Sequence, residues 1–354
     1  MSPKMTHRSA YRSFYRKLRA MKLQSLLHYT LDRKYRRNGV PLRTSRAVVR
    51  YFLALLFLAG SYPALPHIAR AQEVAITFDD LPSHGPLPDG TTREEVTRKI
   101  LQAFKEAGVP EVYGFINAGK MRDHPEDRQV LQLWREAGQP LGNHTLDHMN
   151  LNDNTPEAFE ANIAKNEDVL ESLMGKNDWH WFRYPYLNEG NTLEKRRAVR
   201  SYLKDHHYRI AQVTLDFEDY AWNSPYARCS DQKNEKSIAW LRESYLNTAA
   251  EYMKLGRQLS QQIFHRDIKY VLLMHIGAFD AQMLPQLLAQ MKQQGYRFIK
   301  LQQAQDDPAY ETDPDFAFET GGTLLDQIIE ARQLEFPPHA EKPMKALAAT
   351  CRAQ

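Results

Sequence analysis

Short apolar runs alternate with amphipathic stretches along most of the chain. The runs have the length of buried strands, and the stretches repeat apolar residues at helical spacing. Strands are expected at 74–78, 112–116, 140–142, 181–183, 210–213, 270–274 and 297–300. Helices are expected at 92–107, 126–137, 156–174 and 324–331. Strands alternating with helices of this length predict βαβ units and a parallel sheet or barrel.

Two segments depart from this alternation. Residues 231–266 are long, polar and helical in character, so we expect one or two helices lying over the barrel. Residues 306–354 follow the last strand and contain Asp-Pro turn signals around one short helix. We expect this C-terminal extension to wrap over the surface.

Charge is distributed unevenly along the 354 residues. Residues 1–70 hold 15 of the 47 basic residues and a single acid, Asp32. The rest of the chain carries 32 basic and 42 acidic residues, a net charge of −10. Because the globular part is acidic, the overall net charge of +4 does not indicate binding to nucleic acid.

The N-terminal residues contain the three parts of a secretory signal in their usual order. The apolar run at 51–60 is preceded by three arginines and followed by Ala69-Arg70-Ala71, a small-x-small cleavage pattern. We expect cleavage before Gln72, export to the periplasm or exterior, and no stable membrane span afterwards, because the run is short for a bilayer. The long stretch ahead of it is either a real extension or the product of an upstream start codon, and an uncleaved anchor is the alternative.

These observations divide the chain into three parts. The expected parts are a basic extension plus signal peptide (1–71), a catalytic domain (72–305) and a C-terminal extension (306–354). Two cysteines occur, Cys229 and Cys351. An exported protein could pair them, but the sequence leaves a disulfide and two free thiols equally open.

Candidate metal chemistry begins where the first strand ends. Asp79 and Asp80 follow an apolar strand, and His144 and His148 are spaced i, i+4. Two imidazoles and a carboxylate leave coordination positions open, as in catalytic zinc sites. We expect Asp80, His144 and His148 to bind a divalent metal. Zinc is the expected ion, with cobalt, nickel or manganese as alternatives. Side chains alternate along a strand, so Asp79 is left to act as general base.

Three later strand ends supply further candidates. Arg183 could hold Asp79 ionised through a bidentate pair, and the backbone N–H of Tyr186 could donate to an oxyanion. His275 ends an apolar strand and suits a general acid, with Asp219 as its carboxylate partner. Taken singly, an Arg followed by a Pro at a strand end usually marks an ordinary turn. A His at a strand end is more often a core histidine bonded to backbone.

Together the motifs resemble the polysaccharide deacetylases, the NodB-homology domains of carbohydrate esterase family 4. The resemblance covers roughly residues 72–303 and rests on TFDD (77–80), HTLDH (144–148), RYPY (183–186), DFEDY (216–220) and LLMH (272–275). It implies an irregular (β/α)7 barrel and removal of N-acetyl, sometimes O-acetyl, groups from a polysaccharide. It implies the same roles for the base (Asp79), the ligands (Asp80, His144, His148), the base's partner (Arg183), the acid (His275) and the acid's partner (Asp219).

The chain departs from the family pattern near the substrate. Leu81 stands where the family usually has Gly, Tyr220 where it commonly has Trp, and Ile276 where it often has Asp. Trp222 lies close enough to substitute, so Tyr184, Tyr220 and Trp222 are the expected substrate-binding aromatics. His84 is expected to be a loop or substrate residue and not a ligand.

The sequence therefore predicts an exported, metal-dependent hydrolase acting on an acetylated polysaccharide or oligosaccharide. Peptidoglycan, chitin-like oligomers, a biofilm exopolysaccharide and xylan all remain open as substrates. One alternative is an amidohydrolase of the same barrel acting on a non-sugar C–N bond, as the allantoinase-like and cyclic-imide hydrolases do. The other is a non-catalytic carbohydrate-binding protein, against which the retention of both Asp79 and His275 argues.

Overall fold

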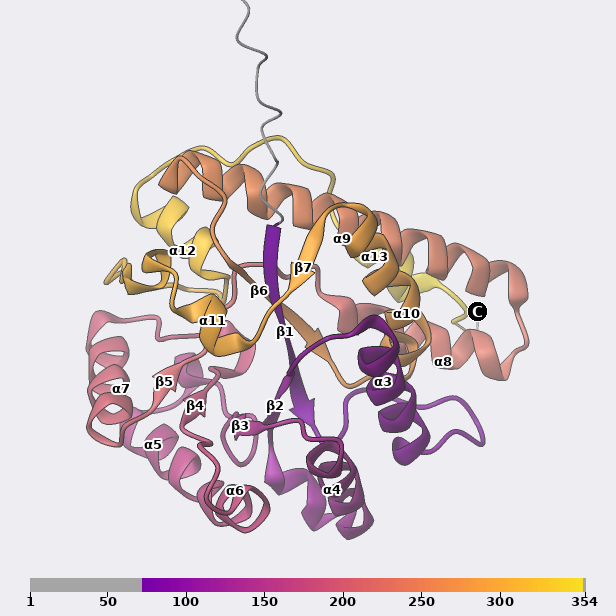
Figure 1. The fold of residues 1–354 in the computed structure, drawn as a ribbon, viewed down its shortest axis with the longest axis horizontal. Coiled ribbons are helices and arrows are strands. Elements are labelled where there is room, and N and C mark those ends of the chain that lie inside the picture. The colour runs from indigo at the N-terminus through magenta and orange to yellow at the C-terminus, as the bar shows by residue number, and fades with distance from the viewer. Residues whose placement is uncertain (1–71, 353–354) are drawn as a thin grey trace, which may run out of the picture. The chain divides into compact units, whose positions relative to one another are not determined.

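The computed structural model describes residues 72–352 and contains a seven-stranded sheet in which every pairing is parallel. The strands are β1 (Gln72–Leu81), β2 (Tyr113–Ile116), β3 (Leu141–Asn143), β4 (Trp181–Phe182), β5 (Arg209–Ile210), β6 (Tyr270–His275) and β7 (Tyr296–Phe298). Their order is β5-β4-β3-β2-β1-β6, and β7 pairs with the start of β1. A parallel bridge from Leu215 to Leu272 links the chain beyond β5 to the opposite edge, so the sheet curls toward closure (Figure 1). The predicted irregular (β/α)7 barrel is confirmed.

Helices surround this sheet. They are α3 (Arg93–Ala107), α4 (Arg128–Glu136), α5 (Pro156–Ala164), α6 (Glu167–Met174), α7 (Leu193–Asp205), α8 (Asn223–Asp231), α9 (Glu235–Phe264), α10 (Ala278–Gln293), α11 (Leu301–Gln305), α12 (Leu324–Ala331) and α13 (Met344–Ala349). Those expected at 92–107, 126–137 and 324–331 and within 231–266 are present, whereas the helices at 193–205, 223–231, 278–293, 301–305 and 344–349 were not predicted. Single 3-10 turns are η1 (Ala118–Arg122), η2 (Pro125–Asp127), η3 (Leu151–Asp153), η4 (Pro185–Leu187), η5 (Asp219–Trp222) and η6 (Pro308–Glu311).

The single helix expected at 156–174 is wrong, because the chain breaks between α5 and α6. The break lies at Asn166, a fully buried residue whose side chain is used by the sheet. Its Nδ2 donates to the carbonyl of Ile116 at 2.8 Å, and its Oδ1 accepts from the Ala118 N–H at 3.0 Å. A buried amide must satisfy its hydrogen bonds, so this tertiary demand outweighs the helical periodicity.

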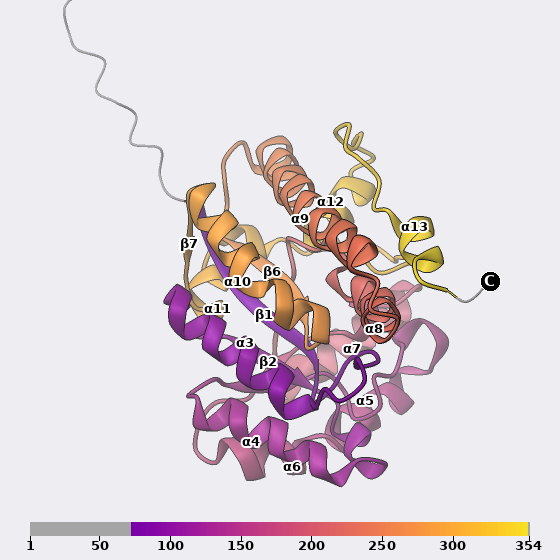
Figure 2. The ribbon, with the colours of Figure 1, turned by 90° about the vertical axis from the view of Figure 1, so that its right-hand side faces the viewer.

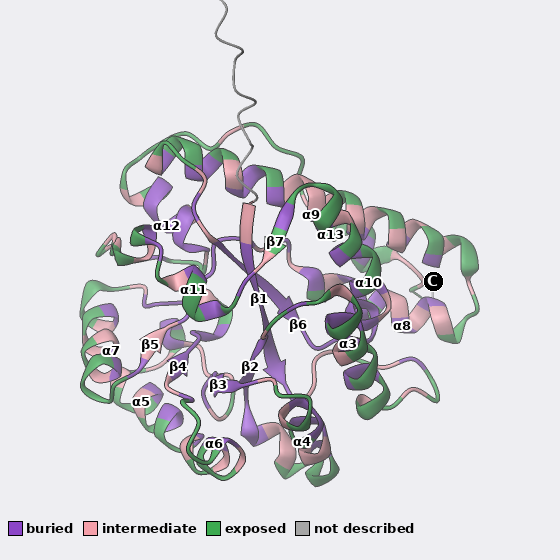
Figure 3. Ribbon diagram, viewed as in Figure 1, coloured by how far each residue is buried: buried purple, intermediate pink, exposed green. Residues whose placement is uncertain are grey.

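Strand β1 is the centre of the core. It pairs with β2, β6 and β7, and its residues from Val74 onward are buried, as Figure 3 shows for the strand as a whole. Phe78 contacts Phe104 of α3 and Trp134 of α4, with ring centroids 5.5 and 5.8 Å apart. Burying each aromatic ring of this kind contributes about 2–3 kcal/mol. The core therefore fixes the strand whose end carries the two candidate aspartates.

The later helices cover one side of the barrel. Helix α9 is the long helix expected within 231–266, and it contacts α8, α10 and α12 (Figure 2). Helix α13 lies against α8, where a disulfide joins Cys229 to Cys351. The disulfide decides the question that the sequence left open.

No helix between residues 72 and 352 combines the length and apolarity needed to cross a membrane. The predicted signal peptide, its cleavage site and the basic extension lie in residues 1–71, outside the described residues.

Candidate active site

The carboxyl ends of the parallel strands bring the predicted groups together. Asp79 and Asp80 lie at the carboxyl end of β1, just before its last residue Leu81. Asp79 is the register partner of His275 at the end of β6. His144 follows β3 directly, and Arg183 follows β4 directly. Strand ends of this kind form the active-site face of (β/α) barrels.

Three side chains are arranged as a metal site. Asp80, His144 and His148 each offer a ligand atom, and these atoms lie within 4.8 Å of one another. The Nδ1 of His144 lies 2.8 Å from the carbonyl oxygen of Arg183, which leaves Nε2 to face the site. A ligand histidine is ordinarily held in this way by its second ring nitrogen. The donor set and its outer support therefore fit a divalent transition metal.

The charge state of the three groups also fits metal binding. Burial alone would raise the pKa of Asp80, but Lys120, His148 and His144 hold that pKa well below its usual range. Burial lowers the pKa of both histidines. An ionised carboxylate and neutral imidazoles are the forms that ligate metals. Lys120 Nζ contacts Asp80 Oδ1 at 3.0 Å, so it supports the ionised ligand.

Asp79 is held by a buried arginine. Arg183 is 1% exposed, and its Nη1 donates to both carboxylate oxygens of Asp79 at 3.0 and 3.1 Å. The remaining arginine donors bind the Ala211 carbonyl and the Thr77 hydroxyl, which fixes the guanidinium. Burial raises the pKa of Asp79 to about 6, against the lowering effect of Arg183. A carboxylate with a pKa close to neutrality is suited to general-base work.

His275 is held by Asp219 on η5. Its Nδ1 lies 2.8 Å from one Asp219 oxygen, and its backbone N–H donates to the other at 2.7 Å. Burial alone would lower the pKa of His275, but the Asp219 carboxylate raises it to about 10. The imidazole is therefore protonated near neutral pH. Asp219 contacts Nδ1, so Nε2 is the nitrogen that can donate a proton to substrate.

Left-handed backbone occurs at several non-glycine residues of the site, and at others elsewhere between residues 72 and 352. Asp80, His148, Tyr186 and Glu218 are not glycines, yet their φ angles are 68°, 53°, 58° and 57°. Left-handed backbone costs free energy in such residues and persists where the surrounding structure demands it. The strained conformation of these four residues indicates that the local folding serves the site.

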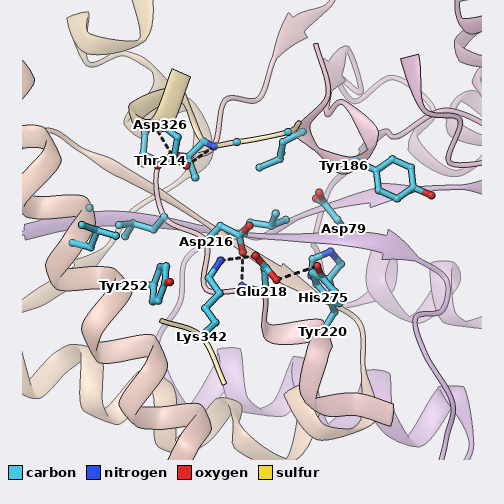
Figure 4. Close-up of a pocket in the computed structure, with 18 of the residues that line it drawn as sticks. Asp79, Tyr186, Thr214, Asp216, Glu218, Tyr220, Tyr252, His275, Asp326 and Lys342 are labelled. Carbon is cyan, nitrogen blue, oxygen red and sulfur yellow. Dashed lines mark hydrogen bonds and ion pairs between the residues drawn. The ribbon is translucent and has the colours of Figure 1, made fainter. Parts of the chain in front are cut away.

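A cavity of about 560 Å³ opens over these groups, a size in the range of ligand pockets. Tyr186 and Tyr220 line it, with side chains 58% and 37% exposed. The Tyr220 ring lies 5.0 Å from the His275 ring, and the Tyr186 ring 4.3 Å from the His148 ring. Figure 4 shows Asp79, Tyr186, His275 and Tyr220 around one end of this cavity.

Two of the expected substrate-binding aromatics lie elsewhere. Tyr184 is 2% exposed and packs on Phe159, and it does not line the cavity. Trp222 is fully buried, and its ring N–H donates to Ser244 at 2.9 Å. Both side chains belong to the core, so the expectation that they contact substrate is corrected to a packing role.

Other residues enter the site without having been predicted. Lys120 reaches Asp80 from η1, 40 residues along the chain, and no motif marks it. His84 stands closer to the chemistry than expected: its Nε2 lies 3.6 Å from Asp80 Oδ2 and its ring 5.0 Å from that of His275. Its i, i+4 spacing from Asp80 was the available signal. The C-terminal segment also lines the cavity, so a surface wrap describes it incompletely.

Comparison with known proteins identifies the domain. Residues 68–235 match the family model described as polysaccharide deacetylase. A chitooligosaccharide deacetylase of Azorhizobium caulinodans is 32% identical over 114 residues, 32% of this chain and 47% of that protein. A peptidoglycan-N-acetylglucosamine deacetylase of Bacillus cereus is 28% identical over 148 residues, 42% of this chain and 46% of that protein. The chain thus spans about half the length of these relatives.

Solved structures show weaker similarity. A family 4 carbohydrate esterase from Streptomyces lividans, solved in complex with acetate, is 18% identical with a TM-score of 0.42, covering 66% of this chain and 96% of that one. A pseudoenzyme of the same family from Bacillus anthracis is 16% identical with a TM-score of 0.46, covering 67% of this chain and 66% of that one. The family model over residues 68–235, the relatives and the strand-end motifs together support a polysaccharide deacetylase domain of the NodB-homology type in this part of the chain.

Proposed function

We propose that this protein is a metal-dependent deacetylase that removes N-acetyl, or alternatively O-acetyl, groups from an exported or cell-envelope polysaccharide. The observation that carries the proposal is the joint placement of a metal-ligand set, a buried Asp–Arg pair and a buried His–Asp pair around one cavity. This combination offers a base, an acid and a place for a Lewis acid, which amide hydrolysis needs.

The metal would be held by Asp80, His144 and His148. When bound, a divalent ion such as zinc lowers the pKa of a water molecule and polarises a carbonyl oxygen. Two of the three ligands are held by further contacts, His144 by the Arg183 carbonyl and Asp80 by Lys120, which supports a preformed site.

The chain's own groups carry the proton transfers. Asp79 takes a proton from the attacking water, whose oxygen forms a bond to the acetyl carbon. The Tyr186 N–H donates to the oxyanion that develops as the carbonyl becomes tetrahedral. His275 gives its proton to the leaving nitrogen as the C–N bond breaks, so acetate and a free amine leave the site. Arg183 and Asp219 position the base and the acid without contacting substrate.

We also propose export. The Cys229–Cys351 disulfide supports it, because structural disulfides persist in oxidising compartments. The test is the N-terminal sequence of the mature protein from its native host. A start at Gln72 in the exterior or periplasmic fraction supports the proposal, and an intact N-terminus in the cytosol contradicts it.

The activity is tested by acetate release from a panel of substrates. The panel contains N-acetylated chitooligosaccharides, peptidoglycan fragments, acetylated xylan, and the non-sugar substrates allantoin and a cyclic imide. We expect acetate from at least one acetylated glycan and no hydrolysis of the non-sugar amides. Hydrolysis of allantoin or the imide without acetate release from any glycan would transfer the protein to the other amidohydrolase class.

A further inference from the structure

The cavity does not end at the catalytic groups. It continues between α9 and the C-terminal segment, defined here as residues 312–352, which follows the barrel's last elements. The second arm is lined by polar and aromatic residues and by apolar residues of α9 such as Leu255 and Leu259. The polar and aromatic ones are Asp216, Tyr252, Asp326, Phe336, His339 and Lys342. Figure 4 shows Asp216 between the His275 end and the arm that holds Tyr252, Lys342 and Asp326.

The C-terminal segment is fixed to the loops that bear the catalytic groups. The Gly321 backbone passes so close to Tyr186 that an added Cβ would stand 1.7 Å from the Tyr186 carbonyl oxygen. Lys342 Nζ donates to Glu218 Oε1 at 2.7 Å, next to the Asp219 that holds His275. The segment is therefore a wall of the active site, anchored at its end by the Cys229–Cys351 disulfide.

The second arm is rich in hydrogen-bond acceptors. Asp216 Oδ1 accepts from the Glu218 N–H at 2.7 Å, and Asp326 Oδ2 accepts from Thr323 at 2.8 and 2.9 Å. Within residues 72–352, the second oxygen of each of these two aspartates accepts no hydrogen bond, and both side chains line the cavity. The carboxylates of Asp216, Glu218 and Asp326 line this arm together with one ammonium group, that of Lys342.

Aromatic faces stand beside these acceptors. Phe336 lines the cavity and is 45% exposed. Lys342 Nζ lies 4.5 Å from the ring centroid of Tyr252 on α9. Sugar rings offer apolar faces for such aromatics and hydroxyl or amino groups for the carboxylates. A long acyl chain could pack on Leu255 and Leu259, which also line this part of the cavity, but it would desolvate the aspartates without giving them hydrogen bonds.

We propose that the C-terminal segment completes a second sugar subsite, in which Phe336 stacks on a sugar unit next to the one that is deacetylated. Asp216 and Asp326 accept hydrogen bonds from the hydroxyl or free amino groups of that unit. The excess of carboxylates selects a neutral or amine-bearing hexosamine and rejects a unit that carries a carboxylate. This inference rests on the proposed function and narrows its substrate to a polymer that carries a neutral or amine-bearing hexosamine next to the deacetylated unit.

Binding is measured first, so that the test does not depend on turnover. The inactive Asp79→Asn variant, loaded with zinc, is titrated calorimetrically with N-acetylglucosamine, with its tetramer, and with a tetramer that alternates hexosamine with hexuronic acid. We expect the neutral tetramer to bind at least about tenfold more tightly than the monosaccharide and the uronic-acid tetramer, the gain of one or two added polar or stacking contacts.

Two substitutions and a matched control locate the binding. Adding Phe336→Ala or Asp216→Asn should remove most of the tenfold advantage, and Asp216→Asn should also reduce the discrimination against uronic acid. Leu334→Ala is the control, because Leu334 is 37% exposed on the same segment but does not line the cavity. It should leave the advantage unchanged, and thermal unfolding of every variant reports its folding.

Three results would overturn the subsite. The first is equal affinity for the monosaccharide and the neutral tetramer. The second is a tetramer affinity that stays tenfold higher in folded Phe336→Ala and Asp216→Asn variants. The third is tighter binding of a long-chain N-acyl glucosamine that Phe336→Ala abolishes. The last would assign the arm to an acyl chain. Length-dependent binding without acetate release by the wild-type protein would instead contradict the proposed function alone.

Discussion

The pair of His275 and Asp219 supplies a prediction about pH. As the general acid, His275 must hold a proton at Nε2 when the C–N bond breaks. Burial works against that proton, and the Asp219 carboxylate more than offsets burial, which raises the pKa of His275 to about 10. Replacing Asp219 with asparagine keeps the side chain's shape and removes the charge that holds the proton.

The magnitude follows from the burial of this pair. Asp219 is fully buried, and removing one partner of a buried ion pair costs about 3–5 kcal/mol. One pKa unit corresponds to about 1.4 kcal/mol. A loss of about 3–4 kcal/mol from the protonated imidazole should therefore lower the pKa of His275 by roughly two to three units, from about 10 to about 7 or 8. The basic limb of kcat/KM should move down by the same amount. At pH 9 the variant should lose about tenfold to a hundredfold in kcat/KM through this change, and lowering the pH to 6 should recover that loss.

The pKa of His275 also predicts how the free energy of unfolding depends on pH. A histidine whose pKa is raised by folding stabilises the fold fully below its ordinary value of 6.5, and this contribution disappears as the pH rises through about 10. Asp219→Asn should therefore lower the free energy of unfolding most at pH 6, and the difference from wild type should shrink toward pH 10.

The assay is the pH dependence of kcat/KM for acetate release between pH 5 and 10.5. Asp307→Asn is the control, because Asp307 is also buried and paired with an arginine, Arg266, away from the cavity. It should lose stability without moving the basic limb. A basic limb in Asp219→Asn that coincides with the wild-type limb would refute the assignment of His275 as the acid.

Three further perturbations test other parts of the site. His148→Ala should weaken zinc binding by at least about tenfold, and full retention of metal by elemental analysis would count against the ligand set. Gly321→Ala should displace the Tyr186 loop, lowering kcat and costing about 1–3 kcal/mol, because its Cβ has no room; unchanged kinetics would show that the close approach is dispensable. Cys351→Ser opens a loop of 122 residues and should cost about 2–5 kcal/mol, read from denaturant unfolding, and wild-type stability would contradict it.

The strand ends explain why so much of the site could be predicted from sequence. Asp79, Asp80 and His275 each follow an apolar run, and parallel strands place such residues on one edge whatever the detailed packing. The pairing of Asp79 with Arg183 needed only the further expectation that a buried carboxylate seeks a guanidinium. Topology predicted where these residues lie, and the resemblance of the combined motifs to the deacetylases was needed to favour catalytic roles over a turn or a core histidine.

The remainder depends on contacts that no local pattern encodes. Lys120 joins the site because η1 lies beside the β1 end, and Asn166 breaks a helix because the sheet uses its side chain. Lys342 reaches Glu218 across 124 residues. Trp222 was wrongly predicted to contact substrate because it lies close to a motif in sequence. Closeness in sequence does not determine the direction in which its ring packs, and the ring is buried in the core.

The central claim is that bound metal and the Asp79 base together remove acetyl groups. The decisive measurement is acetate release from N-acetylated chitooligosaccharides by wild-type protein and Asp79→Asn, each stripped with chelator and then reloaded with zinc. We expect wild-type activity to disappear with the metal and return with it, while Asp79→Asn binds zinc normally and stays nearly inactive. Chelator-resistant turnover, or near-normal turnover in Asp79→Asn, would contradict the claim.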